Sequence, residues 1–167
     1  MSNEYHFVTH WRVRGKVEEI LLILGDAEDL KRWWPSVYLD VKKQGDETVE
    51  LFTKGWLPYT LRWSFRVTEK RPDGFALDAF GDFVGHGDWH LEQDGDFTNI
   101  TYDWRIKAEK PLLRILSPIL KPLFGANHRW AMARGEESLQ IELDRRHGLG
   151  ERMPPQATFW KRMKDEA

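Results

Sequence analysis

Apolar and polar residues alternate along most of the chain between Val37 and Lys107. The clearest run lies at positions 59–67, where every second residue is large and apolar and the residues between them are polar or charged. A period of two is typical of a strand with one buried face. Turn sequences such as Arg71-Pro72-Asp73-Gly74 separate these runs and leave no room for crossover helices. The pattern therefore predicts antiparallel strands joined as hairpins.

The alternating runs predict seven strands. The first is residues 5–13, where Tyr5, Trp11 and Val13 fall on the side expected to face inward. Six more follow, at residues 37–43, 47–56, 59–70, 75–80, 84–93 and 97–108. Gly81, Gly85 and Gly87 indicate a bulge or a sharp bend near the fifth and sixth strands.

Helical spacing appears on both sides of the strand region. Residues 16–34 predict two short helices, the second capped by Asp26 and stopped by Pro35. Residues 112–145 predict one long helix, in which Ser117 and Pro118 are suitable residues for its regular start. The order of elements predicts an α+β fold, with a curved seven-stranded antiparallel sheet wrapped around the long C-terminal helix.

Composition narrows the class of protein. The 167 residues favour one domain, residues 1–146, followed by a polar tail at residues 147–167 whose last part, from Gln156, reads as a short exposed helix. A net charge of −2, with both signs interspersed, gives no basic stripe for nucleic acid. The absence of cysteine, of a signal peptide and of an apolar run long enough to span a bilayer leads us to expect a cytoplasmic protein.

A sheet that curls around one helix tends to leave an apolar cavity between them. Nine tryptophans and nine phenylalanines supply flat apolar surface for such a site. The inward-facing positions give a candidate ligand-binding set, with Trp34 expected near an entrance: Trp34, Leu61, Trp63, Phe65, Leu77, Trp89, Tyr102, Trp104, Leu120, Phe124, Asn127 and Arg134.

Each part of this set also has a purely structural interpretation. The aromatic rings would equally build a packed core. Asn127, Arg134 and Ser138 are polar members of an otherwise apolar helical stripe, where they would contact either a ligand or solvent and acidic neighbours. Tyr102 could polarise a ligand carbonyl, act as a general acid, or form a hydrogen bond within the core.

Motifs for other chemistry are weak. His86, Asp88 and His90 share one strand face, but that face is expected to be exposed and no fourth ligand is evident, so we expect no metal site. The glycines between Gly81 and Gly87 precede no helix and therefore predict no nucleotide site. We expect no cofactor and assign no catalytic residue.

Three segments carry a combined pattern: Val17 to Leu24 leading into Asp26 and Arg32-Trp33-Trp34-Pro35-Ser36-Val37, then Ala79 to Trp89, and Asn127 to Gly135. Together they resemble the START-like helix-grip superfamily, most closely its polyketide cyclase and dehydrase subgroup. The resemblance implies a sheet that grips the C-terminal helix around a hydrophobic cavity. It does not imply a reaction, because members range from passive carriers to cyclases.

These observations predict a protein that binds a hydrophobic small molecule, such as a lipid, an isoprenoid or an aromatic polyketide. A polyketide cyclase or aromatase is the alternative. A second alternative is a docking accessory for a membrane or a protein, because residues 112–124 are strongly apolar and contain Arg114 and Lys121, and because the tail carries Phe159-Trp160-Lys161-Arg162. The sequence leaves the oligomeric state open.

Overall fold

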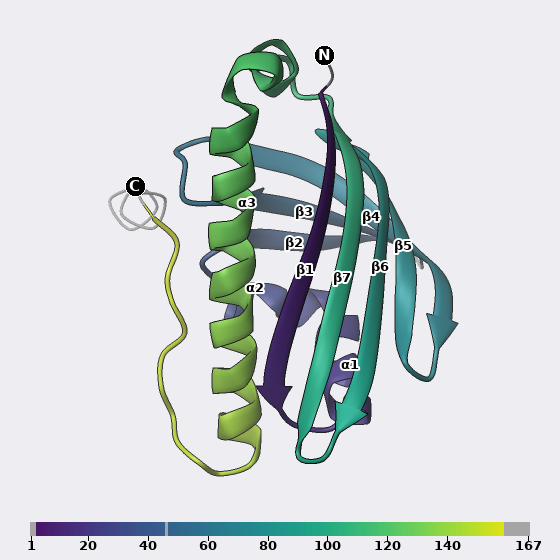
Figure 1. The fold of residues 1–167 in the computed structure, drawn as a ribbon, viewed down its shortest axis with the longest axis vertical. Coiled ribbons are helices and arrows are strands. Elements are labelled where there is room, and N and C mark those ends of the chain that lie inside the picture. The colour runs from purple at the N-terminus through teal and green to yellow at the C-terminus, as the bar shows by residue number, and fades with distance from the viewer. Residues whose placement is uncertain (1–2, 46, 159–167) are drawn as a thin grey trace.

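The computed structural model describes residues 3–45 and 47–158, and seven strands form one antiparallel sheet (Figure 1). The sheet order is β1-β7-β6-β5-β4-β3-β2, so all but one of the neighbouring pairs are consecutive in the chain. The strands are β1 (Glu4–Arg14), β2 (Tyr38–Gln44), β3 (Thr48–Lys54), β4 (Thr60–Arg71), β5 (Gly74–Gly81), β6 (Phe83–Asp94) and β7 (Phe97–Ala108). The predicted seven-stranded antiparallel sheet is confirmed.

The helices also follow the predicted order. Helix α1 (Val17–Gly25), a 3₁₀ turn η1 (Ala27–Asp29) and helix α2 (Leu30–Trp33) come between β1 and β2, and helix α3 (Pro111–Arg146) follows β7. Figure 1 shows the sheet curving around α3, with α1 at the end of the molecule where α3 ends. The structure therefore has the helix-grip arrangement.

The alternation of inward and outward side chains along the strands determines which residues form the core. On β1, Tyr5, Trp11 and Val13 are buried and Phe7 on the same face packs against the core, while the alternate residues His6, Val8, His10 and Arg12 are exposed. The register pairs Tyr5 with Ile106 and Trp11 with Ile100, so inward residues of β1 meet inward residues of β7. This pairing gives the sheet one continuous apolar face toward the helices.

The glycines at residues 81–87 do not mark a register shift. The shifts lie instead between Tyr38 and Asp40 on β2 and between Val67 and Glu69 on β4. Gly87 pairs regularly with Trp104. A β-carbon at Gly87 would lie 2.9 Å from the Tyr102 hydroxyl and 3.0 Å from the Trp104 ring, so glycine here makes room for two aromatic side chains.

The start of α3 differs from the prediction. The helix begins at Pro111, in the first turn where proline is favoured, and it continues through Pro118 and Pro122. Ser117 therefore does not cap the helix. It is fully buried, and its hydroxyl lies 2.6 Å from the hydroxyl of Tyr5. A contact between distant segments, which local sequence does not reveal, decides its role.

The chain after α3 runs back along the molecule without regular structure to Thr158 (Figure 1). There the Thr158 hydroxyl donates to the carbonyl oxygen of Trp56 at 3.1 Å. Residues 156–158 are not helical, and the rest of the predicted tail helix lies outside the described residues. Within the described part of the chain, no helix is long and apolar enough to cross a membrane.

Candidate functional site

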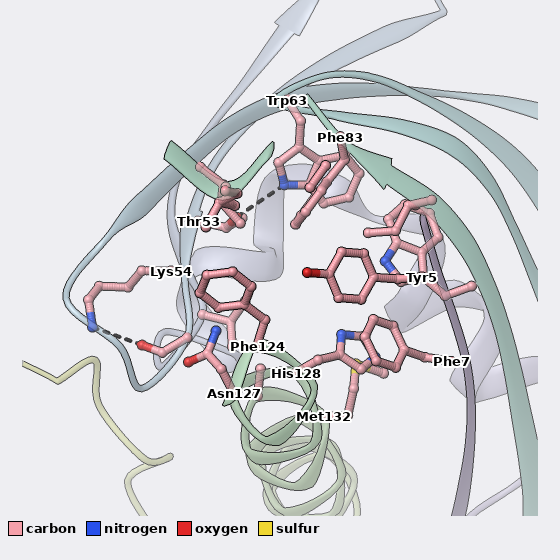
Figure 2. A pocket seen from close by; sticks show the side chains of 18 of the residues that line it. Tyr5, Phe7, Thr53, Lys54, Trp63, Phe83, Phe124, Asn127, His128 and Met132 are labelled. Carbon is pink, nitrogen blue, oxygen red and sulfur yellow. Dashed lines mark hydrogen bonds between the residues drawn. The ribbon is translucent and has the colours of Figure 1, made fainter. Parts of the chain in front are cut away.

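A small cavity of about 110 Å³ lies between the first half of α3 and the sheet (Figure 2). All four tyrosines of the sequence line it, together with phenylalanine and tryptophan rings. Its polar lining residues are Thr53, Lys54, Asn127 and His128. The predicted cavity between sheet and C-terminal helix corresponds to this space.

A larger cavity of about 900 Å³ extends beneath the short helices. Its walls come from α1, η1 and α2 on one side and from β2 to β5 on the other. Among the described residues, Met132 is the one from α3 that lines it. Charged side chains such as Arg66, Lys70 and Arg71 line part of it. Most of the hollow space in the fold therefore lies outside the contact of α3 with the sheet.

The two cavities share one wall. Five residues line both of them: Trp34, Tyr38, Trp63, Tyr102 and Met132. Trp34 is 3% exposed and lies in this wall, so it does not mark an entrance as expected from the sequence. Movement of these side chains would join the two cavities into one.

Aromatic rings form a continuous row along the sheet. The ring centroids of Trp63 and Trp104 are 5.6 Å apart, those of Trp104 and Tyr102 are 5.6 Å apart, and those of Tyr102 and Trp89 are 4.0 Å apart. These distances are typical of favourable ring pairs. The same side chains therefore pack against one another and also line the two cavities.

Several polar groups at the smaller cavity are already hydrogen-bonded. The side-chain oxygen of Asn127 accepts from the backbone N–H of Leu57 at 2.9 Å, and its nitrogen donates to the Tyr59 hydroxyl at 3.1 Å. The indole N–H of Trp63 donates to the Thr53 hydroxyl at 3.0 Å (Figure 2). Asn127 thus anchors the β3–β4 loop, residues 55–59, on α3.

Lys54 is a buried cation at the edge of this site, 3% exposed. Its ammonium group donates to the Gly55 carbonyl at 2.8 Å and to the Thr158 hydroxyl at 2.6 Å. Burial lowers the pKa of Lys54. These contacts fasten the chain beyond α3 to the β3–β4 loop.

Other polar atoms in the shared wall and beside it have no partner. The indole nitrogen of Trp34 and the Nε2 atom of His128 are buried without a hydrogen bond. The hydroxyls of Tyr38 and Tyr102 form no hydrogen bond with any described residue. Buried polar groups normally have partners, so these four can accommodate a hydrogen-bonding molecule.

Burial keeps these groups neutral. Burial, together with the nearby charge of Arg129, lowers the pKa of His128 to about 4, so the imidazole carries no charge at pH 7. Burial raises the pKa of Tyr38, and burial followed by the proximity of Tyr38 raises the pKa of Tyr102. Both phenols therefore stay protonated and can donate a hydrogen bond or accept one.

The residues predicted from the sequence do not all line the same cavity. Seven line the smaller cavity: Trp34, Leu61, Trp63, Tyr102, Trp104, Phe124 and Asn127. Phe65, Leu77 and Trp89 line the larger one. Leu120 and Arg134 line neither.

Leu120 and Arg134 lie outside the cavities for separate reasons. Residues 112–124 carry apolar side chains around most of the helix, so spacing alone could not identify the inner face, which the structure assigns to Leu113, Ser117 and Phe124. Arg134 pairs with Glu137 at 3.2 Å on the helix surface.

Sequence reasoning missed His128, Tyr38 and Lys54. His128 follows Phe124 by four residues and precedes Ala131 by three, so helical spacing alone could have placed it on the cavity face. Lys54 gave no such signal, because its burial depends on contacts with Thr158.

The histidines of β6 are engaged elsewhere. His86 lies 2.9 Å from Asp78, Asp88 pairs with Arg71 at 2.8 Å, and His90 lies 3.5 Å from Asp73. Among residues 3–45 and 47–158, no group of three His, Asp or Glu side chains is positioned to hold a metal ion.

Comparison of the fold with solved structures gives consistent matches. The Zhui aromatase/cyclase from a Streptomyces species is 14% identical, with a TM-score of 0.65 over 86% of this chain and 96% of that one. A START superfamily protein from Mycobacterium smegmatis is 16% identical, with a TM-score of 0.59 over 84% and 97%. The chain has a START-like helix-grip fold.

A conserved protein from Geobacillus kaustophilus is also similar in fold, with 15% identity and a TM-score of 0.64 over 84% of this chain and 96% of that one. No protein-family model and no curated protein sequence matches the chain. At these identities the likeness concerns the fold, and the chemistry of the START-like cavity has to be argued from its own residues.

Proposed function

We propose that this chain is a cytoplasmic protein that binds a hydrophobic small molecule carrying hydroxyl or carbonyl groups. One observation carries the proposal: Trp34, Tyr38, Tyr102 and His128 present unpaired polar atoms in and beside the shared wall of two aromatic-lined cavities. Ligand sites are typically apolar with a few placed polar groups, and this arrangement fits that description.

Cavity size favours the larger space for the body of the ligand. Its volume of about 900 Å³ lies within the usual range of small-molecule sites, whereas about 110 Å³ suits a single ring or a short chain. Burial of apolar ligand surface would contribute about 25 cal/mol per Å², less the cost of immobilising the ligand. A lipid, an isoprenoid or an aromatic polyketide meets these requirements.

A cyclase or aromatase activity is the second candidate. The observation in its favour is the pair of protonated phenols, Tyr38 and Tyr102, in the shared wall. Such hydroxyls could hold a ketone oxygen and donate a proton during enolisation. The polar atoms of Asn127 are occupied by the β3–β4 loop, so Asn127 is a poorer candidate for this role.

Native mass spectrometry of the protein from its own cells, followed by denaturing extraction, would identify a bound molecule. Leu21→Trp should fill the larger cavity and abolish binding, whereas Leu22→Trp, on the exposed side of the same helix, should retain it. Equal ligand occupancy in both variants, with matching Tm values, would contradict the proposed site. Conversion of a linear poly-ketone that stops in Tyr102→Phe would favour the enzyme.

A further inference from the structure

The first turns of α3 carry an exposed apolar ridge, which we call the outer ridge. It consists of Leu112, Ile115, Ile119 and Leu123, whose exposed fractions are 51%, 73%, 78% and 42%. Their spacing of three, four and four residues places them on one side of the helix. The outer ridge is therefore a continuous apolar surface.

The same turns are also apolar on their inner side. Leu113 and Phe124 line the smaller cavity. A helix at a protein surface normally has a polar outer face, and a helix that is apolar all round is normally buried. No segment among the described residues buries the outer ridge. Its composition therefore points to a binding surface.

Charge distinguishes the possible partners. Between positions 110 and 135 the sequence has no aspartate or glutamate, although the whole chain has a net charge of −2. Arg114 and Arg129 are exposed in this stretch, and neither forms an ion pair with a described residue, whereas the ammonium group of Lys121 lies 5.0 Å over the ring of Tyr5. The surface is thus both apolar and locally cationic.

A second copy of this chain suits the surface poorly. A symmetric dimer through the outer ridge would place residues 110–135, which carry no acidic side chain, against the same residues of the other copy, so their arginines would meet no acidic partner. A bilayer with anionic headgroups complements both features, because it accepts apolar side chains below the headgroups and attracts the cations. We propose that the outer ridge docks the protein on an anionic membrane surface. This docking does not depend on the function proposed above.

Co-sedimentation of the full chain with vesicles tests the proposal. The probes are vesicles of phosphatidylcholine alone and of phosphatidylcholine with phosphatidylglycerol in a three-to-one ratio. We expect binding to the anionic vesicles that weakens at about 0.5 M salt. Ile115→Ser combined with Ile119→Ser should lower the bound fraction at least about fivefold, because it removes the most exposed apolar side chains.

Leu22→Ser is the matched control, because Leu22 is 73% exposed on α1, as Ile115 is on α3. It should bind like the wild type, and all variants should share one Tm. If the double variant loses stability, Arg114→Gln with Arg129→Gln, which removes two exposed arginines, replaces it and should weaken binding to anionic vesicles.

Three results would overturn the proposal. The first is an absence of wild-type binding to either vesicle, and the second is undiminished binding by both double variants. The third is a concentration-dependent dimer in sedimentation velocity that the Ile115→Ser and Ile119→Ser variant abolishes, because a second copy would then occupy the ridge. A chain ending at Thr158 should bind vesicles like the full chain. Loss of binding in this shorter chain would assign membrane binding to residues 159–167.

Discussion

The ring of Trp34 lies directly against the backbone of Gly135 in α3. A β-carbon built on Gly135 would lie 2.3 Å from Cζ2 of Trp34, closer than real side chains approach. Trp34 also packs edge-on against Trp11 and Tyr38. Because Trp34 belongs to the wall shared by the two cavities, this contact fixes the position of that wall relative to the helix.

Gly135→Ala should therefore destabilise the protein, although alanine favours helices. We expect a loss of about 1 to 3 kcal/mol in the free energy of unfolding, as in other overpacked cores. Gly125→Ala is the control, because its β-carbon would lie 3.4 and 3.8 Å from the nearest atoms. This variant should gain up to about 1 kcal/mol in the free energy of unfolding. Urea unfolding of both variants measures the difference, and an equal effect at the two sites would contradict the packing argument.

Asn127→Ala should release the β3–β4 loop from α3. The substitution leaves the backbone N–H of Leu57 and the hydroxyl of Tyr59 without their partner, which should cost about 1 to 3 kcal/mol. Limited proteolysis should then cut near Trp56 faster than in the wild type. Asn99→Ala, which removes a surface contact with Arg12, serves as the comparison and should leave cleavage unchanged.

Glu142 is a buried carboxylate that joins α3 to α2. It is 2% exposed and accepts hydrogen bonds from Arg32, Arg145 and Arg146. Burial acts to raise the pKa of Glu142, but hydrogen bonds from Arg145, Arg32 and Arg146 outweigh it, so the pKa lies well below the usual value. Its stabilising effect is present above about pH 4.5 and is lost as the pH falls toward the lower pKa of the folded state.

Glu142→Gln should cost roughly 2 kcal/mol at pH 7, a figure lowered from that of fully buried pairs because the arginines are partly exposed. Glu137→Gln, which removes an exposed partner of Arg134, should cost less than about 0.5 kcal/mol. Chemical unfolding at pH 7 and pH 3 tests the assignment. The difference between wild type and Glu142→Gln should shrink at the lower pH, and a constant difference would argue against it.

His128 should make the protein sensitive to mild acid. Its pKa is about 4 in the folded state and about 6.5 when the chain is unfolded, so the unfolded chain takes up the proton first. Stability is then full above about pH 6.5 and falls as the pH drops toward 4, by up to about 3 kcal/mol.

His128→Phe keeps the stacking contact with Phe7, whose ring centroid lies 4.0 Å away, but removes the titrating group. The free energy of unfolding should differ less between pH 7 and pH 4.5 for this variant than for the wild type. His10→Phe, on the outer face of β1, should keep the wild-type difference. A full wild-type difference in His128→Phe would assign the acid sensitivity to another group.

The strands could be predicted from the alternation of apolar and polar residues, because each strand buries one face. Residues 59–67 show this plainly, and the structure pairs β4 with both neighbours in an antiparallel sheet, as predicted. The prediction of a bulge or a sharp bend at Gly81, Gly85 and Gly87 was correct only for Gly81, which ends β5 with a φ of 115° at the turn into β6, while Gly85 and Gly87 cause no register shift. Gly87 accommodates the rings of Tyr102 and Trp104 from the neighbouring strand, and a sequence does not show which residue lies across the sheet.

Residues of the candidate site could be predicted from the sequence where the strand or helix that carries a residue determines the direction of its side chain. Trp63 and Tyr102 line the cavities because they occupy inward positions of strands. Lys54 was not readable, because its burial depends on Thr158, about a hundred residues later. Trp34 was expected at an entrance and lies in the interior, because it packs on Gly135.

The sequence by itself determined the order of helices and strands, the inward face of most strands and the apolar character of the cavity, since these follow from local periodicity. Only the tertiary structure decided which side of residues 112–124 faces the sheet, because apolar side chains lie around most of that helical segment. It also decided that the hollow space is divided by a shared wall, because that wall forms when side chains from four separate elements meet.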